Sequence, residues 1–479
     1  MSITLNYPEY SKAYDEMFSG LEKPREHYKE VYEILNQMEL NQFKEKEIFA
    51  KLVSVNQGIT FTVYSDGKGI ERIFPFDLIP RIILKQEWDT IDSGLKQRIK
   101  ALNLFLADIY SEGSIIKDQI IPADLVYSCP DFIPEMVGVK VPFGIYTHIS
   151  GIDIIRDSDG DYYVLEDNLR TPSGVSYVLE NRIIMKRTFP EIFKENSVLR
   201  VDSYPSLLHD MLSSIAPNGK EKPTIVLLTP GVYNSAYYEH VFLASQMGVQ
   251  LVENYDLMIS DHKVYMKTID GLKQVDVIYK RVDDSFIDPL VFRKDSLLGI
   301  PGLFECYKRG NVSLANAIGN GVADDKAVYS YVPDMIRYYL NEKPILKNIP
   351  TYRFGIEQEK EEALKKLDRL VVKATNQSGG YGMLIGKDAT SEELEAYKEK
   401  IIENPRNYIA QPIINLSTAP CFFNGSIEPR HIDLRPFAIY SPNGINLIPG
   451  GLTRVALKKG SLVVNSSQGG GSKDTWVVG

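Results

Sequence analysis

The first part of the chain places apolar residues at helical spacing. Between residues 8 and 55, Val31, Ile34, Leu35 and Met38 fall on one face of a helix. This segment carries little reactive chemistry, so we expect it to be helical and to serve packing.

Alternating apolar and polar positions predict two hairpins. Residues 59–76 contain two apolar-rich runs on either side of Ser65-Asp-Gly-Lys-Gly69, and residues 147–168 contain two more on either side of Asp157-Ser-Asp-Gly160. Helices are expected after each hairpin, over residues 93–110 and 175–186.

A different pattern follows at residues 224–252. Residues 224–229 form a short apolar run of the kind found in buried parallel strands. The turn at 229–231 leads into an expected helix that ends at Gly248, and residues 249–252 begin another strand. This βαβ unit predicts a small doubly wound sheet.

Beyond residue 320 the pattern predicts a helix over 325–340, a solvent-exposed helix face over 357–368, and strands and hairpins up to the glycine-rich segment 466–474. A chain of 479 residues exceeds the usual size of one domain. The fold class expected is therefore α/β (α+β), with two or three lobes.

Composition argues against several classes of protein. Lys and Arg total 54 against 63 Asp and Glu, a net charge of -9, which argues against non-specific nucleic-acid binding. No apolar run approaches the ~20 residues of a membrane span. The three cysteines lie far apart, which disfavours a disulfide framework or zinc site and favours a reducing cytoplasm.

The hairpin at 147–168 carries the first candidate site. Antiparallel pairing would bring Asp153 beside Glu166, with Asn168 two residues further along on the same face. Two carboxylates and an amide oxygen are suitable ligands for Mg²⁺. The alternative is a solvated acidic hairpin.

Arg170 follows directly. Its guanidinium can bind a phosphoryl or carboxylate oxygen through two hydrogen bonds. Exposed N–H groups of Ser173, Gly174 and Val175, at the start of the expected helix, would bind an anion. The alternative is an Arg170–Asp167 ion pair beside an ordinary turn.

Residues 370–383 predict a strand that carries Lys373, followed by a glycine loop. Such a loop can close its N–H groups over phosphates while the lysine neutralises their charge. The loop glycines are Gly379, Gly380 and Gly382. The segment is not a P-loop, because the Gly-Lys-Ser/Thr at a helix start is missing, and a simple turn is the alternative. Residues 408–412, which include Gln411, predict a strand that ends at a hinge. Backbone groups at this hinge could bind the edge of an adenine base.

Lys326 lies in the first turn of the helix that Asp324 or Asp325 would cap. The helix dipole disfavours a cation there, and such exceptions are typical of functional sites. A phosphate between the helix start and Lys326 would remove the conflict. The alternative is an exposed surface lysine.

A further strand pattern places His431, Asp433 and Arg435 on one face, with Arg454 on a neighbouring strand. Two arginines on a sheet surface suit anion recognition, and a ladder of surface salt bridges is the alternative. No Gly-x-Ser-x-Gly motif accompanies the histidine, which disfavours a hydrolase.

The segments that carry these candidate residues, taken in their order along the chain, resemble the circularly permuted ATP-grasp family (type 2). This family is related to the synthetase domain of glutathionylspermidine synthase. The resemblance extends from about residue 60 to the C-terminus. It rests on residues 151–153, 165–177, 322–328, 370–383, 431–437, 451–454 and 467–476.

The resemblance implies a circularly permuted ATP-grasp fold, in which the metal-binding strands precede the lysine strands. It divides the chain into an N-terminal helical segment (1–58), a permuted portion with the metal-binding hairpin (59–200), a small pre-ATP-grasp-like domain (201–320) and a nucleotide-binding portion (321–479).

The resemblance also implies roles for residues. ATP and Mg²⁺, with two ions, are the implied cofactors, and the implied metal ligands are Asp153, Glu166 and Asn168. The implied nucleotide residues are Lys326, Lys373, Gly379, Gly380, Gly382, Gln411 and Arg435, with residues 376–382 as a flap over the phosphates. The implied residues beside the acyl phosphate are Arg170, Ser173 and Gly174, with Arg281 and Arg454 as further arginines of the site.

The implied activity is ATP-dependent ligation of a carboxylate to an amine through an acyl phosphate. A nucleotide-binding scaffold or regulator, and a carboxylate kinase without an amine acceptor, are alternatives. A Rossmann dehydrogenase is disfavoured because residues 229–233 lack Gly-x-Gly-x-x-Gly. Genes of the family often lie near those of a helical companion protein and a transglutaminase-like protease, which indicates a peptide substrate.

Overall fold

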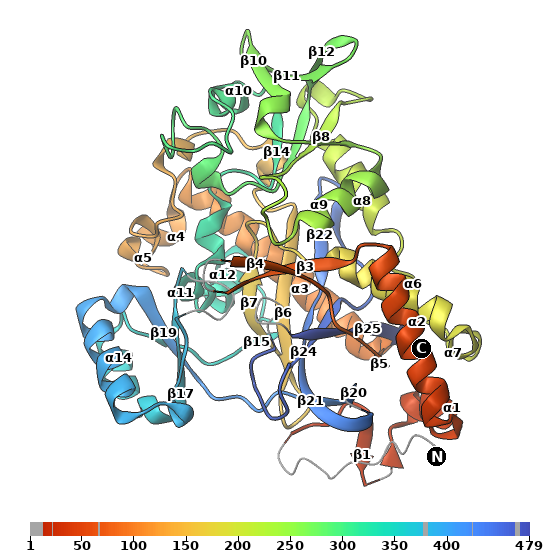
Figure 1. Cartoon of the computed structure of the whole chain (residues 1–479). Helices are drawn as coiled ribbons and strands as arrows, with labels where there is room; N and C mark the ends of the chain where they lie inside the picture. Colours follow the sequence, from red (N-terminus) through yellow and green to blue (C-terminus); the bar gives the residue numbers. More distant parts are fainter. Residues whose placement is uncertain (1–12, 22, 66–67, 377–381, 424, 465–469) are drawn as a thin grey trace.

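The protein combines one large sheet with two four-stranded sheets and covering helices (Figure 1), which confirms the α/β (α+β) prediction. This computed structural model describes residues 13–21, 23–65, 68–376, 382–423, 425–464 and 470–479. No helix in the described part of the chain is long and apolar enough to cross a membrane.

The large sheet has ten strands. Its main path runs β15–β7–β6–β21–β24–β25–β5, and three further strands pair beside it. The strands are β5 (Phe76–Leu84), β6 (Ile149–Arg156), β7 (Tyr162–Asn168), β15 (Lys347–Asn348), β20 (Thr418–Phe423), β21 (Ser426–Arg435), β22 (Phe437–Ser441), β23 (Gly444–Leu447), β24 (Leu452–Val455) and β25 (Gly471–Val478). The antiparallel pair β6–β7 confirms the hairpin predicted at 147–168.

Successive residues of this sheet enter two different hydrophobic cores, because side chains alternate between the faces of a strand. Trp476 belongs to the core that contains α6 (Val175–Thr188), and its neighbour Val477 belongs to the core that contains α3 (Lys85–Ile109). Each of these two predicted helices therefore covers one face of the sheet.

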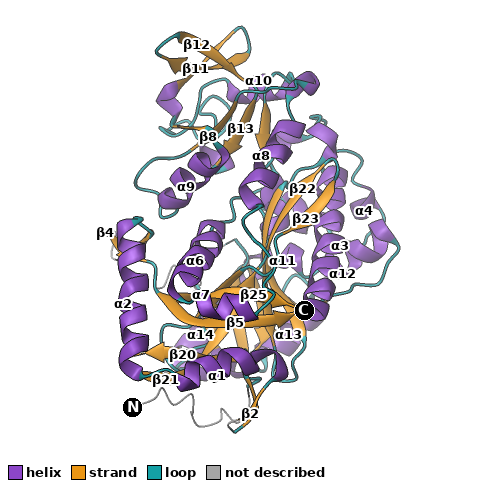
Figure 2. Ribbon diagram, turned by 90° about the vertical axis from the view of Figure 1, so that its right-hand side faces the viewer, coloured by secondary structure: helices purple, strands orange, loops and turns teal. Residues whose placement is uncertain are grey.

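The predicted βαβ unit lies in a separate parallel sheet. Its order is β14 (Ser313–Ala315), β13 (Val277–Lys280), β8 (Ile225–Leu228) and β9 (Gln250–Val252). Helix α9 (Tyr237–Met247) connects β8 to β9 and begins later than expected. Figure 2 shows this sheet with α9 and α8 (Tyr204–Ser214) at one end of the molecule.

The second four-stranded sheet has its own small core. Its order is β16 (Tyr352–Arg353), β19 (Tyr408–Pro412), β17 (Leu370–Ala374) and β18 (Leu384–Ile385). Helices α13 (Glu357–Leu364) and α14 (Ser391–Glu403) accompany it. The strands predicted to carry Lys373 and Gln411 are thus β17 and β19, which pair antiparallel. We call residues 350–412 the small lobe.

The prediction of continuous helix over 8–55 is wrong for part of the segment. Short strands β1 (Phe18–Gly20) and β2 (Lys23–Pro24) precede the helices α1 (Lys29–Gln37) and α2 (Leu40–Asn56). The Asp15 carboxylate accepts the N–H groups of the residues two and three further on, which stabilises a turn in place of a helix. The hairpin β3 (Thr60–Ser65) and β4 (Lys68–Ile73) follows as predicted.

The single helix predicted over 325–340 is also wrong. The chain forms α11 (Lys326–Tyr329), α12 (Val332–Met335) and one turn of wider π-helix at residues 336–340. Pro333 lies in the first turn of α12. Because proline lacks an N–H group and clashes with the preceding helical turn, it ends α11 and starts a new helix.

Candidate active site

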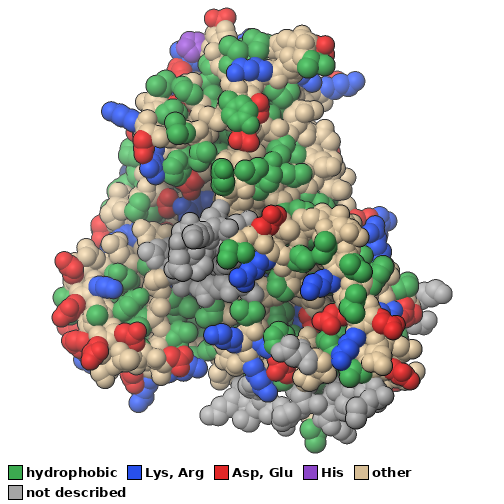
Figure 3. All heavy atoms as spheres, viewed as in Figure 1, with side chains coloured by type: hydrophobic (Ala, Val, Ile, Leu, Met, Phe, Trp, Pro, Cys, Tyr) green, Lys and Arg blue, Asp and Glu red, His purple; other side chains and the backbone are tan. Residues whose placement is uncertain are grey.

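A cleft lies between the small lobe and the adjacent strands β7, β6, β21 and β24 of the large sheet. Its polar lining comes from both sides, and its apolar lining includes Ile349, Val371, Ile385, Ile414 and Leu416. The polar lining residues are Asp153, Glu166, Lys326, Lys373, Gln411, Asp433 and Arg454. Figure 3 shows a hollow in this face of the molecule in which acidic and basic side chains lie together.

The two carboxylates predicted as metal ligands lie opposite each other. Asp153 of β6 pairs with Glu166 of β7, and Asn168 lies opposite Gly151. The register therefore confirms the predicted juxtaposition. A β-bulge follows Asp153 and shifts the pairing from Ile154 onward.

Asp153 is fully buried between two arginines. Arg435 donates from Nε and Nη2 at 2.5 and 2.9 Å, and Arg454 donates from Nη2 at 2.7 Å. Burial acts to raise the pKa of Asp153, but the two guanidinium groups hold that pKa below its ordinary value. Arg454 also pairs with buried Asp433, so the alternative of a surface salt-bridge ladder is wrong.

These ligands fit Mg²⁺ as a set of hard oxygen donors. Among the described residues, no three His, Cys, Asp or Glu side chains are grouped to hold a metal ion. The Asn168 amide oxygen would be a third oxygen donor beside the two carboxylates. The buried Nδ2 of Asn168 has no partner in the described part of the chain. Asp153 would share its carboxylate oxygens between the ion and the two arginines.

Lys326 is held at the cleft by local structure. Asp325 caps α11 through the N–H groups of Ala327 and Val328, as predicted. The Lys326 N–H group donates to the carbonyl of Thr375, just beyond β17, and Lys326 Nζ lies 3.5 Å from Glu166 Oε2. With 15% of its side chain exposed, Lys326 is not the surface lysine of the alternative reading.

Lys373 projects from β17 into the same cleft. Its Nζ donates to Gln411 Oε1 on β19 at 2.8 Å. Burial lowers the pKa of Lys373 to about 8, with Glu166 acting in the opposite direction. Of the loop glycines, Gly379 and Gly380 lie outside the described residues, and Gly382 lies in an exposed turn with φ of 64°.

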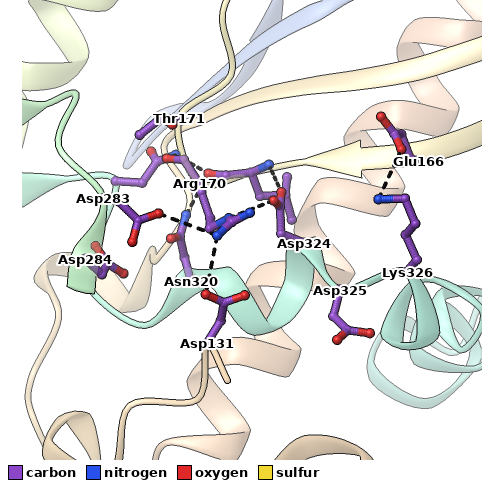
Figure 4. Close-up of polar contacts among 12 residues, drawn as sticks. Asp131, Glu166, Arg170, Thr171, Asp283, Asp284, Asn320, Asp324, Asp325 and Lys326 are labelled. Carbon is purple, nitrogen blue, oxygen red and sulfur yellow. Dashed lines mark hydrogen bonds and ion pairs between the residues drawn. The ribbon is translucent and has the colours of Figure 1, made fainter. Parts of the chain in front are cut away.

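Arg170 forms ion pairs with carboxylates, but Asp167, the partner that the sequence offered as an alternative, is not one of them. Asp167 instead pairs with Arg98 at 2.6 Å, so the Arg170–Asp167 alternative is wrong. Arg170 Nε lies 3.0 Å from Asp324, and Nη1 lies 3.4 Å from Asp131 and 3.5 Å from Asp283 (Figure 4).

The start of α6 already holds an anion. Glu239 of α9 accepts the N–H groups of Gly174 and Ser176 at 2.7 and 3.0 Å, and buried Arg281 contacts both Glu239 and the Ser173 hydroxyl. The prediction of exposed N–H groups at Gly174 is therefore wrong. A helix start buried against another lobe needs an internal acceptor for its N–H groups.

Sequence comparison identifies the family. Residues 80–456 match the family described as circularly permuted ATP-grasp type 2. The chain belongs to the circularly permuted ATP-grasp family. This membership supports an ATP-dependent ligase as the class of activity, and members of this family generally use ATP and Mg²⁺.

The chain also has relatives of high sequence identity. An uncharacterized protein of Synechocystis is 53% identical over 465 residues, covering 97% of both chains. An uncharacterized protein of Mycobacterium tuberculosis is 51% identical over 469 residues, covering 98% of this chain and 84% of its own. A Frankia casuarinae protein provisionally named glutamate–cysteine ligase 2-2 is 41% identical over 467 residues, covering 97% of this chain and 53% of its own.

The fold has a solved counterpart. A glutathione synthetase-like effector from Globodera pallida, in its apo form, matches 92% of this ATP-grasp chain and 98% of its own. The TM-score is 0.60 at 11% sequence identity, so this likeness concerns the fold.

Proposed function

We propose that this ATP-grasp protein joins a carboxylate to an amine through an acyl phosphate, releasing ADP and phosphate. The observation that carries the proposal is the convergence of Glu166, Lys326 and Lys373 in one cleft from β7, α11 and β17. These elements are far apart in sequence, and they bring two lysines and a carboxylate together in one cavity.

The residues of the cleft have separate roles in binding and catalysis. The apolar lining and Gln411 hold the base, while Lys326 and Lys373 bind phosphate oxygens and offset their charge. An oxygen of the substrate carboxylate attacks the γ-phosphorus, and the bond from that phosphorus to the β-phosphate oxygen breaks. Asp153, Glu166 and Asn168 would hold Mg²⁺, which supplies positive charge to the phosphates when bound.

Arg435 and Arg454 act on the site through Asp153. Both donate to its carboxylate, and Arg435 also donates from Nη1 to the Ser173 carbonyl at 3.2 Å. We therefore infer that they keep Asp153 ionised and correctly oriented. Arg170 remains the proposed partner of the acyl phosphate, because it lies next to Glu166 and Lys326 in a shared pocket.

Phosphate release tests the proposal. We expect release from MgATP to require both a pool of carboxylates and a pool of amines, and to fall at least about 100-fold in Lys373→Met, since phosphoryl transfer depends on charge stabilisation. Release that needs only the carboxylates would identify a kinase. An absence of MgATP binding by the wild-type chain would contradict the proposal and leave a scaffold without nucleotide.

The affinity for ATP is expected to fall at alkaline pH. Burial lowers the pKa of Lys373 to about 8. Above that pH the free protein loses the ammonium charge, whereas bound phosphates favour the charged form. The Kd for MgATP should therefore rise by up to about tenfold per pH unit above pH 8. Titrations from pH 7 to 9.5 should show a flatter curve for Lys373→Arg, which stays charged, and equal slopes would contradict the assignment.

A further inference from the structure

Arg406 links the small lobe to the helix that carries Lys326. It lies in the short turn at residues 405–407, directly before β19. Its side chain extends from the small lobe to the rest of the protein, where Nη2 lies 3.0 Å from Asp325 Oδ2. The same nitrogen donates to the Leu125 carbonyl of α5 (Ala123–Tyr127) at 2.8 Å. Arg406 is separate from the described residues that line the cleft.

Asp325 uses a different oxygen for each of two interactions. Its Oδ1 accepts two N–H groups of α11 at 2.7 and 3.3 Å and so caps this helix. Its Oδ2 faces Arg406, and Cys129 Sγ lies 3.6 Å from the same oxygen. Figure 4 shows the Asp325 carboxylate directed away from the Lys326 side chain at the start of the helix. Because the Asp325 side chain is 1% exposed, water screens this ion pair little.

The same guanidinium contacts the end of the strand that carries Lys373. Arg406 Nη1 donates to Thr375 Oγ1 at 3.3 Å, and Thr375 follows β17 directly. The Thr375 N–H group donates to the Asn407 carbonyl at 3.0 Å, and the Thr375 carbonyl accepts from the Lys326 N–H group at 3.2 Å. One side chain therefore contacts the segments that position both lysines.

The two lysines belong to parts of the protein with separate cores. Val328 of α11 lies in the core that contains α3, whereas Val372 of β17 lies in the core of the small lobe. The placement of Lys326 relative to Lys373 therefore depends on contacts between the small lobe and the rest of the chain. Phosphoryl transfer requires charged groups at defined positions around the phosphates, so these contacts matter for function.

Arginine is suited to this linking role. Its planar group offers five N–H donors in fixed directions, whereas a lysine ammonium is a point charge on a flexible stem. The acceptors around Arg406 come from three segments and are Asp325, Thr375 and Leu125. With 18% of its side chain exposed, Arg406 is held largely within the protein.

We propose that Arg406 is a positioning residue that places Lys326 relative to Lys373 for binding of the nucleotide phosphates. This inference rests on the proposed function, because it concerns the phosphates of the ATP assigned to the same cleft. Arg406 acts through Asp325 and Thr375, away from the apolar lining that holds the base. Its loss should therefore weaken binding of the phosphates and leave binding of the base unchanged.

Binding of MgATP and of adenosine to Arg406→Met tests this role. Methionine keeps an unbranched side chain but removes every donor. Calorimetry should show that the Kd for MgATP rises about tenfold, since charged hydrogen bonds that position a lysine are lost. Ligand-observed NMR should show a change of less than about twofold for adenosine. Arg369→Met is the matched control, because Arg369 of the small lobe has an 82% exposed side chain, and both affinities should stay unchanged.

A double-mutant cycle separates positioning from a general effect on stability. Lys326→Met removes the charge that Arg406 is proposed to position. On that background, Arg406→Met should change the Kd for MgATP by less than about twofold, whereas independent effects would multiply. Arg406→Lys keeps the charge beside Asp325 and retains the test if Arg406→Met fails to fold. It should raise the Kd for MgATP about threefold and leave adenosine binding unchanged.

Three results would overturn the inference: unchanged MgATP binding in the Arg406 variants, an equal loss of adenosine binding, or a full tenfold effect on the Lys326→Met background. Each of them leaves the proposed function standing, because the wild-type chain binds MgATP in all three. A wild-type chain that binds no MgATP would overturn the proposed function and this inference together.

Discussion

Replacing Glu166 with alanine is expected to lower the rate of phosphate release about 10³-fold. Glu166 lines the cleft, and its carboxylate lies 3.5 Å from Lys326 Nζ. The substitution removes a proposed metal ligand and also the partner that holds a nucleotide lysine. A metal ion contributes several kcal/mol to charge stabilisation in such reactions, which corresponds to a loss of this size.

The measurement is single-turnover phosphate release at saturating MgATP, once a substrate pair has been found. Glu357→Ala is a matched control, because Glu357 is exposed on α13 and its Lys360 partner plays no part in the cleft. Glu166→Asp should recover part of the rate if a carboxylate ligand is what matters. A Glu166→Ala enzyme within tenfold of wild type would contradict the proposed role.

Local sequence patterns predicted the parts of the site that local structure controls. The turn between β6 and β7 sets the register that brings Asp153 opposite Glu166. The Asp325 cap fixes the start of α11 and hence the position of Lys326. In each case the residues that determine the geometry are close in sequence to the residues that they position.

The same patterns did not predict the parts of the site whose geometry depends on contacts between distant segments. Glu239 is 65 residues from Gly174, and no spacing in either segment indicates that they meet. Asp131, Asp283 and Asp324 likewise converge on Arg170 from three separate segments. Their grouping depends on how the lobes pack, which helical and strand periodicity do not encode.

The helix predicted over 325–340 shows a mixed outcome. Its apolar positions Val328, Tyr331, Met335 and Tyr339 predict one buried face; the first three are buried, and Tyr339 is half-buried. The helix nevertheless breaks at Pro333, because the spacing of apolar residues does not reveal a missing backbone N–H group. Apolar periodicity identified most of the buried positions, whereas the proline at position 333 determined where the helix breaks.

Replacing Glu239 with alanine should destabilise the protein by about 3–5 kcal/mol, the usual cost of removing one partner of a buried ion pair. Glu239 is 1% exposed and Arg281 is 5% exposed. Without Glu239, Arg281 loses a carboxylate 3.5 Å away, and the Gly174 N–H group and the Ser176 hydroxyl lose their acceptor. Unfolding in urea, followed by circular dichroism, measures the change.

The pattern of variants separates a charge effect from a packing effect. Glu239→Gln keeps an acceptor for the N–H groups of α6 but removes the charge opposite Arg281, so its loss of stability should be intermediate. Glu305→Ala removes a half-buried glutamate of α10 (Leu303–Lys308) that pairs only with Arg309 among the described residues, and should change stability by less than about 1 kcal/mol. If Glu239→Ala and Glu305→Ala unfold at the same urea concentration, Glu239 is not the anion that joins α9 to the start of α6. The helix start would then be stabilised by its backbone alone and would be free to receive an anionic substrate, as the sequence first indicated.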